Sequence, residues 1–325
     1  MSSPLDALSQ AERARLPKGK PPTGEQTMKA TLTDARFDDP DWVFERKLDG
    51  IRCLAVRDGG PVRLLSRNNL SLHNRFPELA VALESEPDTR FAVDGEVVAF
   101  DRGQTSFSRL AERGHTHVPV FLYAFDVLWL DGYDVRGLPL LTRKRLLRRT
   151  LRFTGGVRWT PHRNEHGLAL FQHACGRGWE GVIAKRKASV YTDRRSPDWL
   201  KFKCEHGQEL VIGGYTEPRG SRVQFGALLV GYYDPDGALR YAGKVGTGFD
   251  HFALSDIGAR LRALERDESP FADPGAIRER GVHWVAPELV GEVGFTEWTD
   301  AGRLRHPRFQ GLRDDKSARE VFREQ

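Results

Sequence analysis

The sequence predicts an α+β protein with two domains, of which the second is a small β-barrel. A chain of 325 residues is long enough for two domains of the usual ~100 to 200 residues each. In the first part of the chain, short β-like runs alternate irregularly with helix-like stretches, a pattern typical of mainly antiparallel sheets with helices packed on them. Residues 206–325 instead contain four or five β-like runs and a single helical segment. This second pattern favours a closed barrel of the oligonucleotide-binding (OB) type.

The first 41 residues are polar and contain a proline-rich stretch at 17–22 (PKGKPP). We expect an extended approach segment there, with regular structure beginning near Trp42. The β-like runs of the domain that follows, residues 42–205, are 43–47, 51–57, 62–66, 91–100, 118–130, 181–185 and 199–203. Its expected helices are 76–86, 105–113, 141–152 and 166–177.

The second domain, residues 206–325, begins where the sequence becomes dominated by strand-forming runs. These runs are 209–215, 226–234, 238–245 and 282–296. One helix is expected at 251–266, between the third and fourth runs.

Composition argues against membrane-spanning and disulfide-stapled proteins. Hydrophobic residues make up 39% of the chain and charged residues 29%, and no apolar run approaches the ~20 residues that cross a bilayer. The first residues are polar and lack the basic and apolar blocks of an export signal, so we expect a cytoplasmic protein. Cys53, Cys175 and Cys204 are odd in number, widely spaced and without a C-x-x-C pair. Neither a disulfide framework nor a zinc ribbon is therefore expected.

Positive charge is concentrated in the first part of the chain. Residues 1–205 hold 34 Lys and Arg against 26 Asp and Glu, whereas residues 206–325 hold 16 against 19. This asymmetry favours a polyanionic partner that binds mostly to the first part. The basic helical stretch 141–151 has two interpretations, a helix against DNA phosphates or an amphipathic surface helix.

A lysine followed by an Asp-Gly turn stands between two β-like runs, within residues 45–52 (ERKLDGIR). Taken alone, this K-x-D-G pattern also describes a strand that ends in a tight turn with exposed charges. Further short motifs follow it in order along the chain. They are 66–67 (SR), 93–98 (VDGEVV), 125–128 (FDVL), 180–185 (EGVIAK), 199–203 (WLKFK) and 313–316 (RDDK).

This ordered series resembles the motifs of the covalent nucleotidyltransferases, which comprise ATP-dependent DNA ligases, RNA ligases and mRNA capping enzymes. The resemblance covers the chain from around residue 25 to its end and is closest to the DNA ligases. Residues 295–316 (FTEWTDAGRLRHPRFQGLRDDK) are similar to the ligase module of bacterial ligase D, an enzyme of non-homologous end joining. The resemblance implies an antiparallel-sheet adenylation (nucleotidyltransferase) domain followed by an OB-fold domain.

In that family the lysine of the first motif, which would be Lys47, attacks the α-phosphate of ATP and carries AMP as a phosphoramidate. An amine attacks only when unprotonated, and free lysine has a pKa near ~10.4, so we expect the site to lower the pKa of Lys47. The cations that would do this are a divalent metal ion, Arg52, Lys201 and Lys203. Because Lys201 and Lys203 are two positions apart on an expected strand, both side chains point to one face.

The same resemblance assigns the nucleoside contacts. Glu45 would contact the adenine base, largely through its backbone, Phe125 would stack on the purine, and Glu96 would hold the ribose hydroxyl. Because Phe125 sits in an apolar run, a place in the hydrophobic core fits it as well. Glu96, beside a glycine, also fits a residue that closes a turn.

Phosphate and metal contacts follow in the same way. The arginines that would contact phosphate groups are Arg67 and Arg195, with Arg194 as an alternative to Arg195. Glu180 would hold Mg²⁺ or Mn²⁺, with Glu96 as a second carboxylate, because such hard ions keep most of their waters and need few protein oxygens. Asp49 would act either at the nick or on the metal.

Arg313 and Lys316 match the OB-domain segment that orients pyrophosphate during adenylation. They lie far along the chain from Lys47, so the OB domain must close over ATP and then swing away to admit DNA. We therefore expect a hinge at residues 205–208.

The sequence thus predicts an ATP-dependent polydeoxyribonucleotide ligase. AMP passes from ATP to Lys47, then to the 5′-phosphate of a nick, and is displaced by the 3′-hydroxyl. One alternative is an RNA ligase or capping-type guanylyltransferase, which uses the same lysine chemistry on another acceptor. The other is a DNA-end-binding scaffold without catalytic activity.

The expected partner is nicked double-stranded DNA, bound by a monomer in the cytoplasm close to the nucleoid. The chain has no room before Trp42 for a large helical domain that clasps DNA, and it lacks the polymerase and phosphoesterase modules of many ligase D proteins. We therefore expect help from a Ku-like end-binding protein or from a separate repair polymerase.

Overall fold

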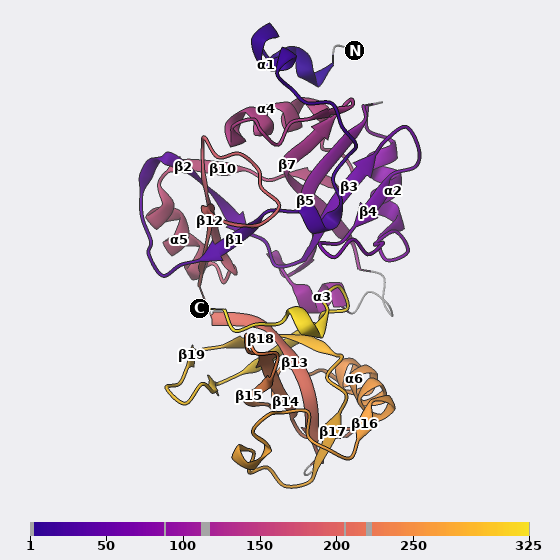
Figure 1. Cartoon of the computed structure of the whole chain (residues 1–325), viewed down its shortest axis with the longest axis vertical. Coiled ribbons are helices and arrows are strands. Elements are labelled where there is room, and N and C mark those ends of the chain that lie inside the picture. The colour runs from indigo at the N-terminus through magenta and orange to yellow at the C-terminus, as the bar shows by residue number, and fades with distance from the viewer. Residues whose placement is uncertain (1–2, 88, 112–117, 205, 219–222, 325) are drawn as a thin grey trace. The chain divides into compact units, whose positions relative to one another are not determined.

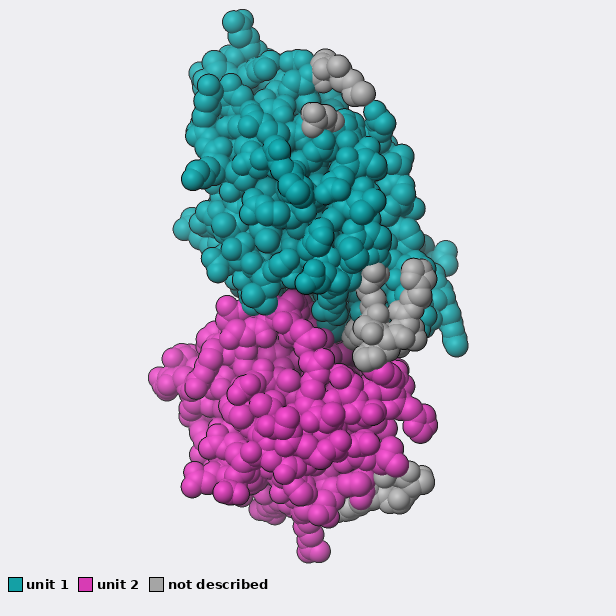
Figure 2. All heavy atoms as spheres, turned by 90° about the vertical axis from the view of Figure 1, so that its right-hand side faces the viewer, with its two compact units in different colours: residues 1–204 teal, residues 205–325 magenta. Residues whose placement is uncertain are grey.

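The computed structural model describes residues 3–324 except 88, 112–117, 205 and 219–222. The chain forms two compact units, residues 1–204 (unit 1) and 205–325 (unit 2), and each is described by itself (Figures 1 and 2). In the part of the chain that is described, no helix is long and apolar enough for a bilayer span.

The N-terminal segment is a structured part of unit 1, so the expectation that regular structure begins near Trp42 is wrong. Its elements are η1 (Pro4–Ala7), α1 (Gln10–Ala14), η2 (Gly24–Gln26) and β1 (Lys29–Leu32). Leu5 and Met28 are buried, and the indole Nε1 of Trp129 donates a hydrogen bond of 2.7 Å to the carbonyl of Gly19 in the proline-rich stretch. Contacts with residues distant in the sequence therefore order this segment, although its local sequence predicts no regular structure.

Unit 1 contains a five-stranded sheet in the order β1-β12-β11-β2-β10. The strands besides β1 are β2 (Asp39–Lys47), β10 (His162–Glu165), β11 (Gly181–Arg186) and β12 (Arg195–Lys203). β1 is parallel to β12, and the other pairs are antiparallel. Helix α5 (Gly167–Gly176) covers one face, where Leu170 and Ala174 pack in a cluster with Phe44 and Phe202 (Figure 1). Because side chains alternate along a strand, Glu45 and Lys47 lie on the opposite face.

A second sheet of unit 1, called the large sheet, has the order β4-β3-β5-β7-β8, with β6 paired to β5 and β9 to β7. Its strands are β3 (Ile51–Arg57), β4 (Arg63–Leu65), β5 (Phe91–Asp101), β6 (Gln104–Thr105), β7 (Val120–Leu130), β8 (Tyr133–Asp134) and β9 (Val157–Trp159). The helices that contribute to the core on one face are α2 (Pro77–Glu84), α3 (Phe107–Ala111) and α4 (Leu140–Thr150).

The two sheets share a hydrophobic cluster. The five-stranded sheet contributes Val43 and Trp199, and the large sheet contributes Leu54, Ala92 and Phe125. Polar side chains on these same two faces therefore lie around one interior, which positions the candidate site.

Unit 2 is built on the long strand β13, which pairs with β14, β17 and β18, and all of its strand pairs are antiparallel. Its strands are β13 (His206–Thr216), β14 (Leu228–Tyr233), β15 (Leu239–Val245), β16 (Glu265–Arg266), β17 (Val282–Val285), β18 (Val290–Phe295), β19 (Glu297–Trp298), β20 (Leu304–Arg305) and β21 (Arg308–Leu312). Its helices are α6 (His251–Ala263), η4 (Pro274–Ala276) and η5 (Ala318–Glu320). The single strand expected at 282–296 is divided, because Pro287 lies between β17 and β18 and has no N–H for a ladder.

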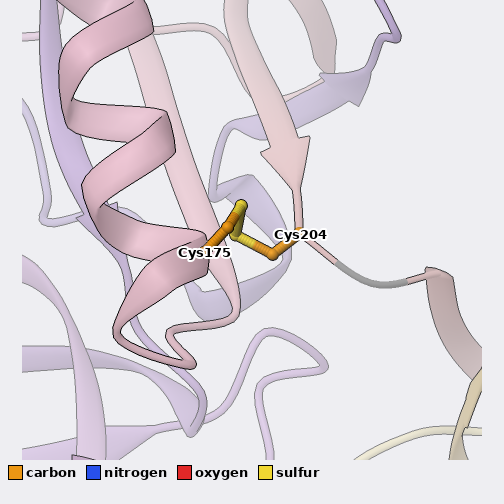
Figure 3. The surroundings of a disulfide bond; sticks show 2 residues. All are labelled: Cys175 and Cys204. Carbon is orange, nitrogen blue, oxygen red and sulfur yellow. A yellow bond between two sulfur atoms is a disulfide. The ribbon is translucent and has the colours of Figure 1, made fainter.

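Cys175 and Cys204 form a disulfide bond, so the expectation of no disulfide is wrong (Figure 3). The bond joins the end of α5 to the residue after β12, with Cα atoms 5.2 Å apart. Cys53 is unpaired and buried. An odd number of cysteines therefore leaves one thiol in the core and still permits one cross-link.

Candidate active site

Lys47 ends strand β2 and lies in register with a glycine and a second lysine. It is opposite Gly181 on β11, which is opposite Lys203 on β12. Gly181 has a φ of 151°, and a Cβ there would lie 1.9 Å from the carbonyl oxygen of Phe202. Only glycine fits this position. The face between Lys47 and Lys203 therefore carries no intervening side chain.

The ammonium group of Lys47 forms an ion pair with the carboxylate of Glu180. Burial lowers the pKa of Lys47, but nearby carboxylates outweigh burial and raise its pKa above the usual lysine value. The carboxylates are Glu180, Glu96 and Asp49. The pKa of Lys47 therefore lies above its ordinary value, and the expectation that the site lowers it is wrong.

The K-x-D-G pattern forms the connection between the two sheets, from β2 to β3. A Cβ at Gly50 would lie 2.2 Å from the carbonyl oxygen of Val97, so a larger residue does not fit. Asp49 accepts a hydrogen bond of 3.0 Å from the backbone N–H of Phe107, at the start of α3. The turn thus fixes the end of β2, and with it Lys47, against the large sheet.

Glu45 belongs to a buried charge cluster that we call the Glu45 cluster: Glu45, Lys144 and Lys185. One carboxylate oxygen pairs with Lys144, the other pairs with Lys185 at 2.7 Å, and all three side chains are 2% exposed. Burial would raise the pKa of Glu45, but the two ammonium groups outweigh it and lower that pKa. For Lys185, burial outweighs the attraction of Glu45, and the pKa is lowered to about 8. Glu45 is therefore held as an anion between two cationic partners.

Phe125 is placed by a β-bulge in β7. Gly95 pairs with Ala124 and Asp94 pairs with Asp126, so Phe125 is the extra residue between them. Its ring lies 4.3 Å from the ammonium of Lys185, measured to the ring centroid. With 7% exposure Phe125 belongs to the core between the sheets, next to the Glu45 cluster.

Arg52, on β3, is a second cation beside the Phe125 ring. Its guanidinium donates two hydrogen bonds, of 2.5 and 2.6 Å, to the buried carboxylate of Asp94, and its Cζ lies 4.7 Å from the Phe125 ring centroid. Burial lowers the pKa of Arg52, but Asp94 raises it further than burial lowers it. Glu96 is directly opposite Arg52 in the β3–β5 register. Asp94 thus orients Arg52, a predicted ligand residue. Asp94 belongs to the motif at 93–98 but was not itself predicted as a site residue.

The remaining predicted site residues of unit 1 lie on β12 or follow β4. Lys201 is opposite Ile183, which is opposite Glu45, so Lys201 and Lys203 share the face that carries Lys47, as predicted. Arg195 begins β12, is exposed, and donates a hydrogen bond of 2.6 Å to the carbonyl of Ala30. Arg67 follows β4 at the edge of the large sheet and is half-buried.

The basic helix α4 is amphipathic, as one of the two interpretations given for residues 141–151 expects, but its buried face includes two charged residues. Arg143 and Lys144 are buried, whereas Arg145 on the same helix is exposed. The sequence does carry a signal for this arrangement. Leu140, Arg143, Lys144 and Leu147 follow the i, i+3, i+4, i+7 spacing of a buried helix face.

Arg313 and Lys316 lie in unit 2, bound to carboxylates of that unit. Arg313 donates two hydrogen bonds to Asp315, of 2.9 and 3.0 Å, and Lys316 pairs with Glu209 at 2.8 Å. Burial lowers the pKa of Arg313, but Asp315 and neighbouring glutamates raise it overall. Glu45, Lys47, Arg52 and Phe125 therefore lie around the interior between the two sheets, whereas Arg195 is exposed and Arg313 and Lys316 belong to a separate unit.

The carboxylates around Lys47 supply the oxygen donors that a hard divalent ion prefers. Among the described residues, no group of three potential ligands is arranged to hold a metal by itself. Mg²⁺ commonly binds through one or two carboxylates together with waters and substrate phosphates. Glu180 and Glu96 fit that mode.

Two family models match the chain. Residues 25–203 match the ATP dependent DNA ligase domain, and residues 221–316 match the ATP dependent DNA ligase C terminal region. Together they cover both structural units.

Individual relatives agree with these models. The multifunctional non-homologous end joining protein LigD of Pseudomonas aeruginosa is 42% identical over 86% of this chain and 34% of that protein. A probable DNA ligase of Streptomyces griseus is 32% identical over 85% of this chain and 57% of that protein. The chain thus spans about a third of the length of the LigD proteins that it matches, between 34% and 38%.

A solved structure shares the fold. It is described as mycobacterial DNA ligase D complexed with ATP and MES, is 37% identical, and covers 92% of this chain and 98% of that chain with a TM-score of 0.70. The match confirms the predicted fold class, an α+β domain with mostly antiparallel sheets followed by an OB-fold domain.

Proposed function

Because the chain belongs to the ATP-dependent DNA ligase family, we propose that it seals DNA nicks by way of an AMP group carried on Lys47. The family matches confirm the resemblance of the motif series. The observation that carries the proposal is the row Lys47, Gly181 and Lys203, in which no side chain stands between the two lysines.

In the first step, the Nζ atom of Lys47 forms a bond to the α-phosphorus of ATP, and the bond from that phosphorus to pyrophosphate breaks. Before this, Lys47 must lose a proton and leave its ion pair with Glu180, because an ammonium group has no lone pair with which to attack. Next, a 5′-phosphate oxygen of DNA attacks the same phosphorus and releases the lysine. Finally, the 3′-hydroxyl oxygen attacks the 5′-phosphate and AMP leaves.

The cations of the site have a direct role in this chemistry. Lys201 and Lys203 project from the same face as Lys47, so they are placed to stabilise negative charge that builds on the α-phosphate as pyrophosphate leaves. Arg67 and Arg195 are assigned to phosphate groups on the basis of the motif series.

The nucleoside contacts are assigned to the Glu45 cluster and to the strand β5. Phe125 and the backbone of Glu45 would contact adenine, and Glu96 the ribose. Two lysines that contact both residues support this assignment. Lys144 pairs with Glu45 and donates to the backbone carbonyl of Phe125, and Lys185 pairs with Glu45 and lies beside the Phe125 ring. Arg52 adds a positive charge beside the Phe125 ring.

A divalent metal ion, Mg²⁺ or Mn²⁺, would be held by Glu180 with Glu96. Bound there, it would neutralise part of the charge of the triphosphate. The same carboxylate of Glu180 pairs with Lys47.

We assign adenylation to unit 1, residues 1–204, because β1 pairs with β12 and so belongs to that domain, and the OB fold to residues 206–325. Arg313 and Lys316 of the second domain would orient pyrophosphate after closure of that domain over ATP. The expected hinge at 205–208 is wrong for its last three residues, because His206, Gly207 and Gln208 belong to β13 and pair with β18. The first residue of that hinge, Glu205, lies outside the described residues.

The biological setting that we propose is DNA repair by end joining in the cytoplasm, near the nucleoid. The similarity to LigD supports this setting, and the net positive charge of residues 1–205 supports nicked double-stranded DNA as the partner. A Ku-like end-binding protein or a separate repair polymerase would assist a monomeric ligase.

The decisive experiment measures the intact mass of the purified chain after incubation with ATP and Mg²⁺. We expect a gain of one AMP group, located on Lys47 by peptide mapping and absent from Lys47→Ala. Lys244→Ala is the matched control, since Lys244 is an exposed lysine of unit 2.

The same preparation separates the alternatives. A ligase must also seal a nicked DNA duplex, whereas a scaffold acquires no adduct from any nucleotide. Preference for GTP, or sealing of RNA nicks only, would instead support the RNA ligase or capping-type alternative.

A further inference from the structure

One lysine connects the two sheets of unit 1 beside the proposed base site. The Nζ atom of Lys144, from helix α4, forms an ion pair with Glu45 on β2 of the five-stranded sheet. It also donates a hydrogen bond of 3.2 Å to the backbone carbonyl of Phe125 on β7 of the large sheet. Both residues assigned to the adenine base thus share a single ammonium group.

Lys185 cannot replace Lys144 in this connection. It binds the other oxygen of Glu45 at 2.7 Å, but its ammonium then faces aromatic rings, 3.9 Å from the centroid of Trp199 and 4.3 Å from that of Phe125. Within the part of the chain that the structure describes, Lys144 is the side chain that joins Glu45 to the backbone of β7. The spacing between β2 and the bulge of β7 therefore depends on Lys144.

The chain crosses between the sheets at the same place. The backbone N–H of Thr160 donates a hydrogen bond of 3.0 Å to the carbonyl of Ala124, and His162 is opposite Glu45 in the β10–β2 register. Within the described part of the chain, the Thr160 hydroxyl oxygen and the His162 Nδ1 are buried without a hydrogen-bond partner. Buried polar atoms of this kind are rare in native proteins and often accompany a ligand or water.

The charge of the cluster argues against a purely structural role. Two lysines surround one glutamate, so the Glu45 cluster holds one positive charge in excess. A buried charge in excess costs free energy, whereas a single pair of Glu45 and Lys185 would be balanced. A role in packing alone does not explain Lys144, because an uncharged side chain would pack there without the free-energy cost of the extra buried charge.

We propose that Lys144 is a positioning residue for the nucleotide base, which fixes the spacing between Glu45 and Phe125 and thereby sets the preference for adenine. This inference rests on the proposed function, since it concerns the base subsite of the same reaction. Lys144 touches neither the phosphates nor Lys47 in this scheme. Its loss should weaken ATP binding and base discrimination, with little effect on transfer of the phosphoryl group.

The test is Lys144→Met, which removes the ammonium group and keeps an unbranched side chain. Formation of the AMP adduct on the full chain is followed in single turnovers at varied ATP and varied GTP. We expect the ATP concentration for half-maximal rate to rise about tenfold or more, the factor for loss of one good contact, while the maximal rate changes less than about threefold. The preference for ATP over GTP should fall as well.

Two further variants make the result decisive. Arg145→Met, an exposed change on the same helix, should leave both quantities unchanged. Lys144→Gln, which keeps an N–H donor with shorter reach, should give an intermediate ATP requirement, and it serves as the test if Lys144→Met does not fold.

The proposal is overturned if the folded Lys144 variants keep the ATP requirement and the ATP preference of the parent chain. It is equally overturned if only the maximal rate falls. A parent chain that forms no adduct at all would instead contradict the proposed function, so the two failures are distinguishable.

Discussion

Arg143 and Asp126 form an ion pair that is completely shielded from solvent. The guanidinium donates hydrogen bonds of 2.8 and 2.9 Å to the two carboxylate oxygens, and both side chains are 0% exposed. Arg143 also donates to the backbone carbonyls of Leu138 and Ser189. One residue thus attaches α4 to β7 and to the segment after β11, and so supports the position of Lys144.

Replacing Asp126 by Asn should lower the free energy of unfolding by about 3 to 5 kcal/mol, because the charge of Arg143 is left buried without its partner. Urea denaturation followed by circular dichroism measures this change. The matched control is Asp198→Asn, which breaks an exposed pair with Arg186 at 3.0 Å and should cost no more than about 1 kcal/mol. Equal losses for the two variants would contradict the role assigned to burial.

Most residues of the candidate site could be predicted because they belong to short sequence motifs. Lys47, Glu96, Phe125 and Glu180 are predicted from the order of their motifs along the chain, and their roles stay predictions. The rise in the pKa of Lys47 was not predictable, since it depends on how three carboxylates from separate segments converge. The buried lysine of α4 was missed for a different reason, because charged residues ordinarily lie on the surface.

Elements with strong local patterns agree closely with the sequence. The strand expected at 51–57 is β3 (Ile51–Arg57), and the helix expected at 166–177 is α5 (Gly167–Gly176). β1 (Lys29–Leu32) was missed, because a strand of four residues is stabilised by its distant partner rather than by its own composition.

The disulfide gives a test at the scale of elements. It closes a loop with a sequence separation of 29 that carries Glu180, Lys201 and Lys203. Under oxidising conditions, Cys175→Ser should lower the free energy of unfolding by roughly 3.5 kcal/mol, from the loop-closure entropy of a loop of that length. Chemical denaturation with and without dithiothreitol measures this.

Three results would support the cross-link as the cause. Cys204→Ser should have the same effect as Cys175→Ser, the double variant should add nothing further, and dithiothreitol should remove the difference from the parent chain. A loss of stability that persists under reduction would point to packing instead.

At the scale of the whole molecule, the residues with proposed roles belong to both units. Lys47 belongs to unit 1, whereas Arg313 and Lys316 belong to unit 2 and are occupied by Asp315 and Glu209 there. These cations can contribute to adenylation only when they exchange those carboxylates for the phosphates of ATP.

Arg313→Ala and Lys316→Ala should therefore slow adduct formation on Lys47 by at least about tenfold, the scale for loss of a charged group that stabilises a transition state. Sealing of a nick that already carries AMP should change much less, because that step releases no pyrophosphate. Comparing the two rates for each variant measures the difference. Arg266→Ala, an exposed arginine of unit 2, is the control. Equal slowing of both steps would contradict the assignment to pyrophosphate.

The pairing of β1 with β12 has a consequence for biosynthesis. Thr31 donates its side-chain hydrogen bond to the backbone of Ser196, a residue 165 positions later in the chain. On the ribosome, β1 emerges early and must wait for nearly all of unit 1 to be translated before its partner exists. The five-stranded sheet, and the lysine at the end of β2 with it, is therefore completed late, and contacts of such long range fold slowly.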